Sequence, residues 1–314
     1  DSIAQSEGWD NLLDPMIAAI HKCENNSGPY CAAPVNIHRI DWMWANKAVF
    51  DANGISVPTT WDELNAAAEK LKAAGIIPFA HGGQAWQDAT VFEAVAMGLG
   101  GNNYYKNCYV DLKESCLRSE TTVKVFDQMR KLQSYTDEGS PGRDWNVATG
   151  MVIEGKAGFQ IMGDWAKGEF TAAGKVPGVD YYCAATPSNN GYLYNVDSFI
   201  FYKSSDPDKQ AGQQLLAKLM MGKNFQKVFN LYKGSIPARL DVSMDEFDKC
   251  AKTSNADIKT AGAKGGLVPS FAHGMAQGNT MKAALQDIIT EHFNSDMSSV
   301  DAANALADSV LANM

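Results

Sequence analysis

Five residues in this chain can stack on a flat ring or form strong hydrogen bonds, and each lies beside an apolar run or a Gly/Pro breaker. They are Trp165 in MGDWAKGEF, Asn195 and Asp197 in YNVDSF, Lys233 in LYKGSIP, and His273 in PSFAHGMA. An aromatic ring can cover the apolar C–H face of a sugar, and charged or amide groups can bind its hydroxyls. Such side chains, gathered at strand ends and loops, are typical of a small-molecule site.

Each of these residues also has an explanation without a ligand. Trp165 can be a core residue near a turn. Asp197 can be an exposed residue at a strand edge, since burying an unpaired charge is costly. Lys233 can be an ordinary surface lysine, and His273 a loop histidine with its hydrogen bonds satisfied. The residue types alone leave both explanations open.

The common motifs of catalytic and metal sites are missing from the sequence. There is no G-x-S-x-G, H-E-x-x-H, Walker A or G-x-G-x-x-G motif. None of the five histidines stands at metal-ligand spacing from another His or a Cys, and no C-x-x-C pair occurs. We therefore predict no catalytic residue, no metal and no cofactor. A glycosidase needs only two facing carboxylates, for which Asp164 and Asp197 are the candidates.

Alternating strand and helix patterns predict an α/β fold around these residues. Thr60, followed three residues later by Glu63, is a capping-box pattern for a helix that continues to Ala73 and stops at Gly75. Other helices are expected at about 1–22, 88–99, 119–135, 206–220, 223–231, 279–293 and 299–312. Extended chain is expected at 30–46, and strands at 76–80, 157–162, 179–184 and 195–202.

Trp165 follows the apolar run at 157–162 and precedes AKGEF, which is typical of a helix start. It therefore lies where a strand ends and a helix begins. In open α/β proteins, ligands bind outside the carboxyl ends of the strands.

The six cysteines are Cys23, Cys31, Cys108, Cys116, Cys183 and Cys250. The first two flank a turn sequence and the next two a short polar stretch, which leaves the last two for each other. An even count with this spacing predicts three disulfides and an oxidising compartment. The alternative, six free thiols in the cytosol, is less favoured because most of these cysteines stand in polar contexts.

Length and charge exclude other classes. The chain has 314 residues, 45% of them hydrophobic, which favours more than one domain. With 27 Lys and Arg against 36 Asp and Glu, its net charge is −9, so we expect no nucleic-acid partner. No apolar run is long enough to span a membrane. Since the chain does not begin with Met and shows no signal peptide, we take it as mature or trimmed.

Several sequence blocks occur in an order that is similar to one family over essentially the whole chain. They are PVNIHRIDWMWANKAVFDANGISVPTTWDEL, GGQAWQDATVFEAV, EGKAGFQIMGDWAKGEF, NVDSFIFY, KGSIPAR and GGLVPSFAHGMA. The chain resembles the bacterial extracellular solute-binding proteins of ABC sugar importers. NVDSF, KGSIP and AHGMA in this order resemble the periplasmic glucose (or glucose/mannose) branch in Gram-negative bacteria.

The resemblance implies a type II periplasmic-binding-protein fold, in which two α/β lobes joined by hinge strands close on a sugar. It matches Trp165 to the aromatic residue that stacks on the sugar. Asp197, Lys233 and His273 match the polar residues that bind its hydroxyls, and we add Asn195 to this site. Further candidates from the same blocks are Trp86, Gln87, His38 and Trp44. The resemblance also implies that Cys183 pairs with Cys250.

One departure concerns the first lobe. Members of the family begin with a long segment that builds most of it, whereas DSIAQSEGWDNLL resembles a helix near the end of that segment. We therefore expect a partial first lobe at 1–37 and 191–239, and a second lobe at 38–190 and 240–314. The expectation is that a further N-terminal segment belongs to the full protein.

The resulting hypothesis is a periplasmic binding protein that captures glucose or a related hexose and delivers it to the membrane subunits of an ABC importer. It is expected to be a monomer whose only membrane contact is with the permease, and not an enzyme. The alternatives are a secreted glycoside-processing enzyme and a binding protein for another sugar, such as a disaccharide.

Overall fold

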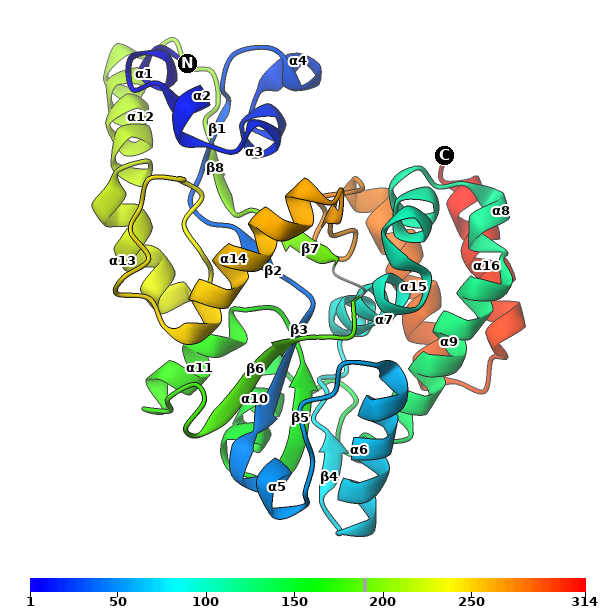
Figure 1. The fold of residues 1–314 in the computed structure, drawn as a ribbon. Coiled ribbons are helices and arrows are strands. Elements are labelled where there is room, and N and C mark those ends of the chain that lie inside the picture. The colour runs from blue at the N-terminus through cyan, green and yellow to red at the C-terminus, as the bar shows by residue number, and fades with distance from the viewer. Residues whose placement is uncertain (189–190) are drawn as a thin grey trace. The chain divides into compact units, whose positions relative to one another are not determined.

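The computed structural model describes residues 1–188 and 191–314, which divide into two units (Figure 1). Unit 1 comprises Asp1–His38 and Val196–Lys252, and unit 2 comprises Arg39–Asn195 and Thr253–Met314. The chain passes from one unit to the other three times. The boundary expected at 190/191 touches residue 190, which lies outside the described residues.

Unit 1 contains short helices, a two-stranded sheet and two longer helices. Its short helices are α1 (Ser2–Ser6), α2 (Trp9–Leu12), α3 (Pro15–Ile20) and α4 (Cys23–Asn26). Strand β1 (Ala32–Pro34) pairs antiparallel with β8 (Ser198–Ile200). The longer helices are α12 (Pro207–Met220) and α13 (Lys223–Lys233), and α14 (Lys249–Ala263) begins in this unit and ends in unit 2.

Unit 2 contains a four-stranded mixed sheet in the order β4-β5-β3-β6. Its strands are β3 (Trp42–Asn46), β4 (Ile77–Phe79), β5 (Ala157–Ile161) and β6 (Tyr181–Ala185). Strand β3 runs antiparallel to β5 and β6, and β4 runs parallel to β5. A second sheet has the order β2-β7-β9, with strands β2 (His38–Arg39), β7 (Tyr192–Asn195) and β9 (Leu267–Pro269).

Helices make up most of the remainder of unit 2. They are α5 (Lys47–Ala52), α6 (Trp61–Ala73), α7 (Ala85–Tyr105), the π-helix η1 (Lys106–Val110), α8 (Glu114–Leu117), α9 (Glu120–Gln133), α10 (Trp145–Ile153), α11 (Ala166–Ala172), α15 (Asn279–Asn294) and α16 (Ser299–Ala312). Helix α7 is buried over most of its circumference between Gln87 and Met97 and packs against α9 and α15. A helix that is buried on all sides in this way belongs to the core.

Several predicted elements are confirmed with their local causes. Helix α6 begins after Thr60, whose hydroxyl accepts from the Glu63 N–H while the Glu63 carboxylate accepts from the Thr60 N–H. The break expected after residue 99 is present, because Gly101 has a φ of 75° inside the stretch assigned to α7. That left-handed conformation is accessible to glycine at little cost.

The single strand expected at 195–202 is wrong, since β7 ends at Asn195 and β8 begins at Ser198. The two residues between them, Val196 and Asp197, carry the chain from one pairing partner to another. Helices α10 and α14 were not expected from the periodicity of the sequence. No helix in the described residues is long and apolar enough to cross a membrane.

A buried arginine lies at the start of unit 2. The Arg39 guanidinium donates to both carboxylate oxygens of Asp41 at 3.2 Å and to Asp257 Oδ2 at 2.6 Å. Its Cζ lies 4.9 Å from the centroid of the Trp42 ring and 4.8 Å from that of Tyr192. A planar guanidinium can combine several directed hydrogen bonds with ring contacts in this way, which a lysine cannot do.

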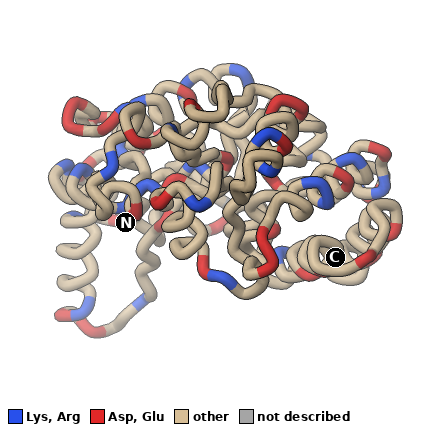
Figure 2. Tube along the Cα trace, turned by 90° about the horizontal axis from the view of Figure 1, so that it is seen from below, with Lys and Arg blue, Asp and Glu red and all other residues tan. Residues whose placement is uncertain are grey.

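Lys and Arg are interspersed with Asp and Glu along the trace of the described residues (Figure 2). Acidic residues are the more numerous, as the net charge of −9 requires.

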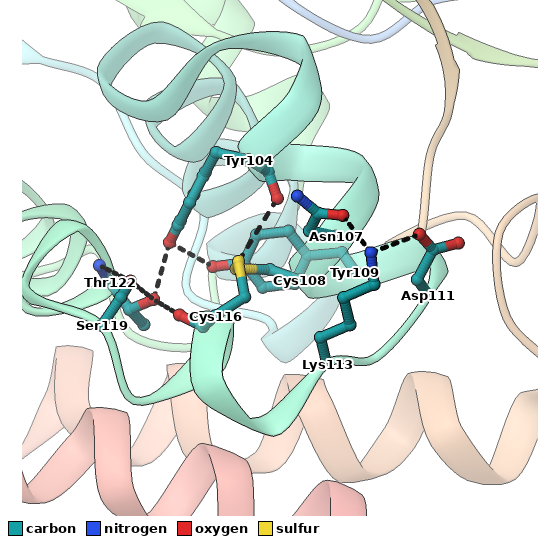
Figure 3. The surroundings of a disulfide bond; sticks show 9 residues. All are labelled: Tyr104, Asn107, Cys108, Tyr109, Asp111, Lys113, Cys116, Ser119 and Thr122. Carbon is teal, nitrogen blue, oxygen red and sulfur yellow. Dashed lines mark hydrogen bonds and ion pairs between the residues drawn. A yellow bond between two sulfur atoms is a disulfide. The ribbon is translucent and has the colours of Figure 1, made fainter.

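None of the six cysteines is free. Disulfides join Cys23 to Cys31 and Cys108 to Cys116, the two local pairs that the spacing predicts, and Cys183 and Cys250 are also disulfide-bonded. The Cys108–Cys116 bond links η1 to α8 (Figure 3). Close to it, the Tyr104 hydroxyl lies 3.1 Å from the Tyr109 hydroxyl and 2.8 Å from Thr122 Oγ1.

We predict that the Cys108→Ala/Cys116→Ala variant unfolds at lower urea concentration, with a loss of about 2–3 kcal/mol in the free energy of unfolding. The cause is the greater entropy of the unfolded chain once a loop of this length is opened. Cys23→Ala/Cys31→Ala is the matched control for loop length, because both disulfides span a sequence separation of 8. The loss should be larger for the Cys108 pair, since Cys108 is fully buried. Equal stability of the wild type and this variant would contradict the prediction.

A second prediction concerns His292 in α15, which is fully buried against Phe126 at a ring distance of 4.8 Å. Neither of its ring nitrogens has a hydrogen-bond partner among the described residues. Burial, together with the positive charge of Arg130, lowers its pKa to about 4. The unfolded chain takes up this proton near pH 6.5, so stability should fall as the pH drops from about 6.5 to about 4.

Replacing His292 with leucine should flatten the pH dependence of stability in that window, by at most about 1.4 kcal/mol per pH unit. Urea unfolding at pH 4.5, 5.5 and 7.0 measures this. His21→Leu is the comparison variant, since it removes another buried histidine whose pKa is lowered by burial but whose two ring nitrogens are both hydrogen-bonded. That variant should lower stability at every pH, because it breaks these bonds. An identical pH dependence in wild type and His292→Leu would show that His292 is not the titrating group.

Candidate functional site

The structure gathers most of the predicted site residues into two clusters, one in each unit. The carboxylate cluster, in unit 1, consists of Asn36, His38, Asp197 and Lys233. The aromatic cluster, in unit 2, consists of Trp86, Thr90, Trp165 and His273. Each cluster is described by itself below.

The Asp197 carboxylate is held by the side chains of Asn36, which precedes β2, and His38, the first residue of β2. Oδ2 of Asp197 accepts from Asn36 Nδ2 at 2.9 Å and lies 3.0 Å from His38 Nε2. The Asp197 N–H in turn donates to Asn36 Oδ1 at 2.8 Å. The reciprocal bonds with Asn36 fix the Asp197 backbone and side chain together, in the two-residue gap between β7 and β8.

Lys233 supplies the positive charge of this cluster. It is the last residue of α13, and Gly234, with a φ of 94°, ends the helix there. Its Nζ lies 3.7 Å from Asp197 Oδ2, and the two side chains are 41% and 39% exposed. An acceptor and a donor therefore stand side by side within reach of solvent. Such a pair can bind adjacent hydroxyl groups with charge-assisted hydrogen bonds.

The pKa of Asp197 lies well below its usual range. Burial by itself would raise this pKa, but the hydrogen bond from His38, the hydrogen bond from Asn36 and the charge of Lys233 together outweigh burial. Asp197 is therefore a carboxylate, and an acceptor only, throughout the neutral and mildly acidic range.

Three rings form the aromatic cluster. Trp86 lies in the first turn of α7, Trp165 is the N-cap of α11, and His273 lies in the turn after β9. The ring centroids are 6.3 Å apart for Trp86 and Trp165, 5.9 Å for Trp86 and His273, and 5.0 Å for Trp165 and His273. All three residues are half-buried.

The turn that carries Trp165 depends on its two preceding residues. A Cβ at Gly163 would lie 2.2 Å from the Trp165 ring, so only glycine lets the ring fold back over the turn. Asp164 is buried, its carboxylate accepts from the Arg39 N–H at 3.0 Å, and its own N–H donates to the Arg39 carbonyl at 3.0 Å. The Asp164 carboxylate is thus engaged with the backbone of β2.

Three of the predicted site residues, Trp44, Gln87 and Asn195, lie outside these clusters. Trp44 is fully buried in β3, where its indole N–H donates to the Met162 carbonyl and its ring stacks on Phe170. Gln87 is also buried, and its amide donates to Gln84 Oε1 and to the Arg143 carbonyl. Asn195 ends β7 at the boundary of unit 2.

Two members of the clusters were not expected from the sequence. Asn36 precedes His38 by two residues in PVNIHRI, and that alternation is the only signal that both side chains point the same way. Thr90 follows Trp86 by four residues, which places the two on one face of a helix. Neither spacing predicts which distant residue Asn36 or Thr90 contacts.

Comparison with known proteins gives one family. The model of the bacterial extracellular solute-binding protein family matches residues 2–220. A "probable sugar-binding periplasmic protein" of Brucella suis is 46% identical over 99% of this chain and 73% of its own length. A protein of the same name from Rhizobium meliloti is 45% identical over 99% of this chain and 74% of its own length.

The fold is also similar to solved structures. The bacterial solute receptor AcbH, described as having an exclusive preference for β-D-galactopyranose, aligns with a TM-score of 0.84 at 18% identity. The alignment covers 100% of this chain and 79% of the receptor. At this identity the likeness concerns the fold.

The electrostatics of the carboxylate cluster lead to a prediction. His38→Leu should raise the pKa of Asp197, because it removes a hydrogen bond to the carboxylate while burial remains. Lys233→Met should cause a smaller rise, since Nζ lies farther away at 3.7 Å. A carboxyl ¹³C NMR titration measures both, with Asp197→Asn to identify the resonance. An unchanged pKa in His38→Leu would refute the assigned cause.

Proposed function

Because this chain belongs to the bacterial extracellular solute-binding protein family, we propose that it is the sugar-binding component of an ABC importer and takes glucose or a related hexose. It is a periplasmic protein with the two-lobe α/β fold of these proteins. In this proposal it captures the sugar and delivers it to the membrane subunits, with no bond made or broken.

The observation that carries the proposal is the chemistry of the two clusters. Half-buried Trp86 and Trp165 offer ring faces to the apolar C–H surface of a pyranose. Asp197 and Lys233 offer an acceptor and a donor 3.7 Å apart to neighbouring hydroxyls. We therefore propose Trp165, Trp86 and His273 as stacking and contact residues, and Asp197, Lys233 and His38 as hydroxyl-binding residues.

The other sequence candidates receive different roles. Trp44 and Gln87 are buried, with their polar hydrogens donated inside the protein, so we assign them to support of the fold. Asn195 remains a candidate by its place two residues before Asp197. We assign unit 1 to the first lobe and unit 2 to the second lobe, and propose that the protein acts as a monomer.

Two alternatives to hexose binding require different chemistry at the site. A glycoside-processing enzyme would need a second carboxylate beside Asp197, and Asp164 is buried and bonded to the backbone of Arg39. A binding protein for another sugar would keep the same residue types. The galactose preference stated for AcbH makes galactose a necessary competitor in any test.

The test is titration calorimetry of this chain with glucose, galactose, mannose and a glucose disaccharide. We expect the tightest binding for a hexose, together with a change in tryptophan fluorescence. Trp165→Ala and Asp197→Asn should each raise the Kd by at least about tenfold, a loss of about 1.4 kcal/mol that is typical of one stacking or charge-assisted contact.

Two exposed residues supply matched controls. Tyr202→Ala removes an aromatic ring that is 77% exposed, and Glu154→Gln removes a surface carboxylate. Neither should change the Kd. Tightest binding of the disaccharide would shift the proposal to a larger sugar, and cleavage of an oligosaccharide on incubation would replace it with the enzyme. Unchanged affinity in Trp165→Ala and Asp197→Asn would overturn the site.

A further inference from the structure

Three residues on one face of α7 contact residues 270–273, the turn after β9, which we call the His273 turn. Trp86, Thr90 and Glu93 are spaced by four and three residues, so their side chains lie above one another along the helix. Trp86 contacts the His273 ring edge-on at a centroid distance of 5.9 Å, and Thr90 Oγ1 lies 3.0 Å from His273 Nε2. Glu93 forms hydrogen bonds with each of the three residues before His273.

The contact with Thr90 determines which ring nitrogen of His273 carries the proton. The Thr90 hydroxyl has one hydrogen, and it donates that hydrogen to the Trp86 carbonyl at 2.8 Å. Toward His273 the same oxygen can therefore only accept, so Nε2 must carry the N–H. In the neutral ring this leaves Nδ1 as the acceptor nitrogen.

Glu93 fixes the backbone from which His273 projects. Its fully buried carboxylate accepts from Ser270 Oγ at 2.7 Å, from the Tyr105 hydroxyl at 2.9 Å, and from the N–H groups of Phe271 at 3.1 Å and Ala272 at 3.3 Å. Ser270 Oγ also accepts from the His273 N–H at 3.1 Å. Three of these four donors belong to residues 270–272, so the buried carboxylate restrains the backbone of the turn.

We propose that Thr90 and Glu93 are positioning residues for sugar binding, which set the tautomer and the place of the His273 ring without touching the ligand. This rests on the proposed function, in which His273 contacts the sugar. Thr90 sets the tautomer because its hydroxyl hydrogen is donated to the Trp86 carbonyl, so its oxygen can only accept from His273. Glu93 sets the turn through its hydrogen bonds to residues 270–272. Precise placement of a contact residue by buried partners is what a preorganised site requires.

The tautomer is measured on the protein without sugar. Imidazole ¹⁵N NMR at pH 8, above the ordinary pKa of histidine and above the value of about 7 to which burial raises the pKa of Glu93, reports the neutral ring. His273→Gln identifies the signal. We expect Nε2–H in the wild type and in Thr90→Ser, and a mixture of both tautomers in Thr90→Val, which has the same shape but no acceptor.

Binding is measured by calorimetry with the sugar that the wild type binds best. Thr90→Val and Glu93→Gln should each raise the Kd by about tenfold, and Thr90→Ser should restore it. In Glu93→Gln an amide NH₂ replaces one carboxylate oxygen and meets groups that donate. The matched control is Gln128→Leu, which breaks a buried reciprocal amide pair with Asn65 and should lower stability without changing the Kd.

The outcomes separate this inference from the proposed function. If the wild type binds none of the sugars, the proposed function fails, while the NMR result still decides whether Thr90 sets the tautomer. If sugar binds but Thr90→Val keeps both the wild-type tautomer and the wild-type Kd, the positioning role is refuted. A rise in Kd for Gln128→Leu as large as that for Glu93→Gln would refute the role of Glu93, since lost stability would then explain both.

Discussion

The arrangement of unit 2 depends on the ion pairs of the buried Arg39 guanidinium with Asp41 and Asp257. A cation removed from water is tolerated only when its charge and its donors are matched, and here Asp41, Asp257 and two aromatic rings match them. Asp41 also accepts from the Leu193 N–H at 3.0 Å, which ties the same ion pair to β7. Removing Arg39 would leave the fully buried Asp41 carboxylate without its cation.

The backbone of Arg39 extends this constraint to the aromatic cluster. Its N–H and carbonyl bond Asp164, and Asp164 immediately precedes the half-buried Trp165. The Trp165 ring therefore lies on a turn that is hydrogen-bonded to Arg39 in β2 and needs glycine at position 163. His273 lies on a turn that is hydrogen-bonded to Glu93 in α7. Both residues that we propose as sugar contacts lie at turns, and both turns are bonded to regular elements, which is how a rigid scaffold usually presents binding residues.

Features that depend only on neighbouring residues were predicted from the sequence. The Thr60–Glu63 capping box, the glycine break at Gly101 and the apolar run of β5 each depend on neighbours within a few residues, and each is present. Trp44 and Trp165 show the limit. Both are tryptophans beside a strand in similar surroundings, yet one fills the core and the other is half-buried. Trp44 packs against Phe170 and Tyr181, and Trp165 packs against His273. In each case the contacting residue is more than 100 positions away in the sequence.

The same limit applies to hydrogen-bond partners. Spacing places Thr90 and Glu93 on the face of α7 that carries Trp86, but their partners in the His273 turn are more than 170 residues away. Asp197 was expected within one continuous strand, whereas it lies where the chain leaves one sheet for another. The sequence shows the periodicity of a helix or strand, but it does not show which distant segment will pack against that element.

The spacing of Trp86, Thr90 and Glu93 restricts how this segment can change in evolution. Each residue of an α-helix turns the chain by about 100°. One residue inserted or deleted between Trp86 and Glu93 would swing one end of the triplet away from the His273 turn, whatever the new residue is. A change in length after Gly101, where the helix is already broken, leaves that phase intact. Relatives that keep this turn should therefore keep the length of the segment 86–93.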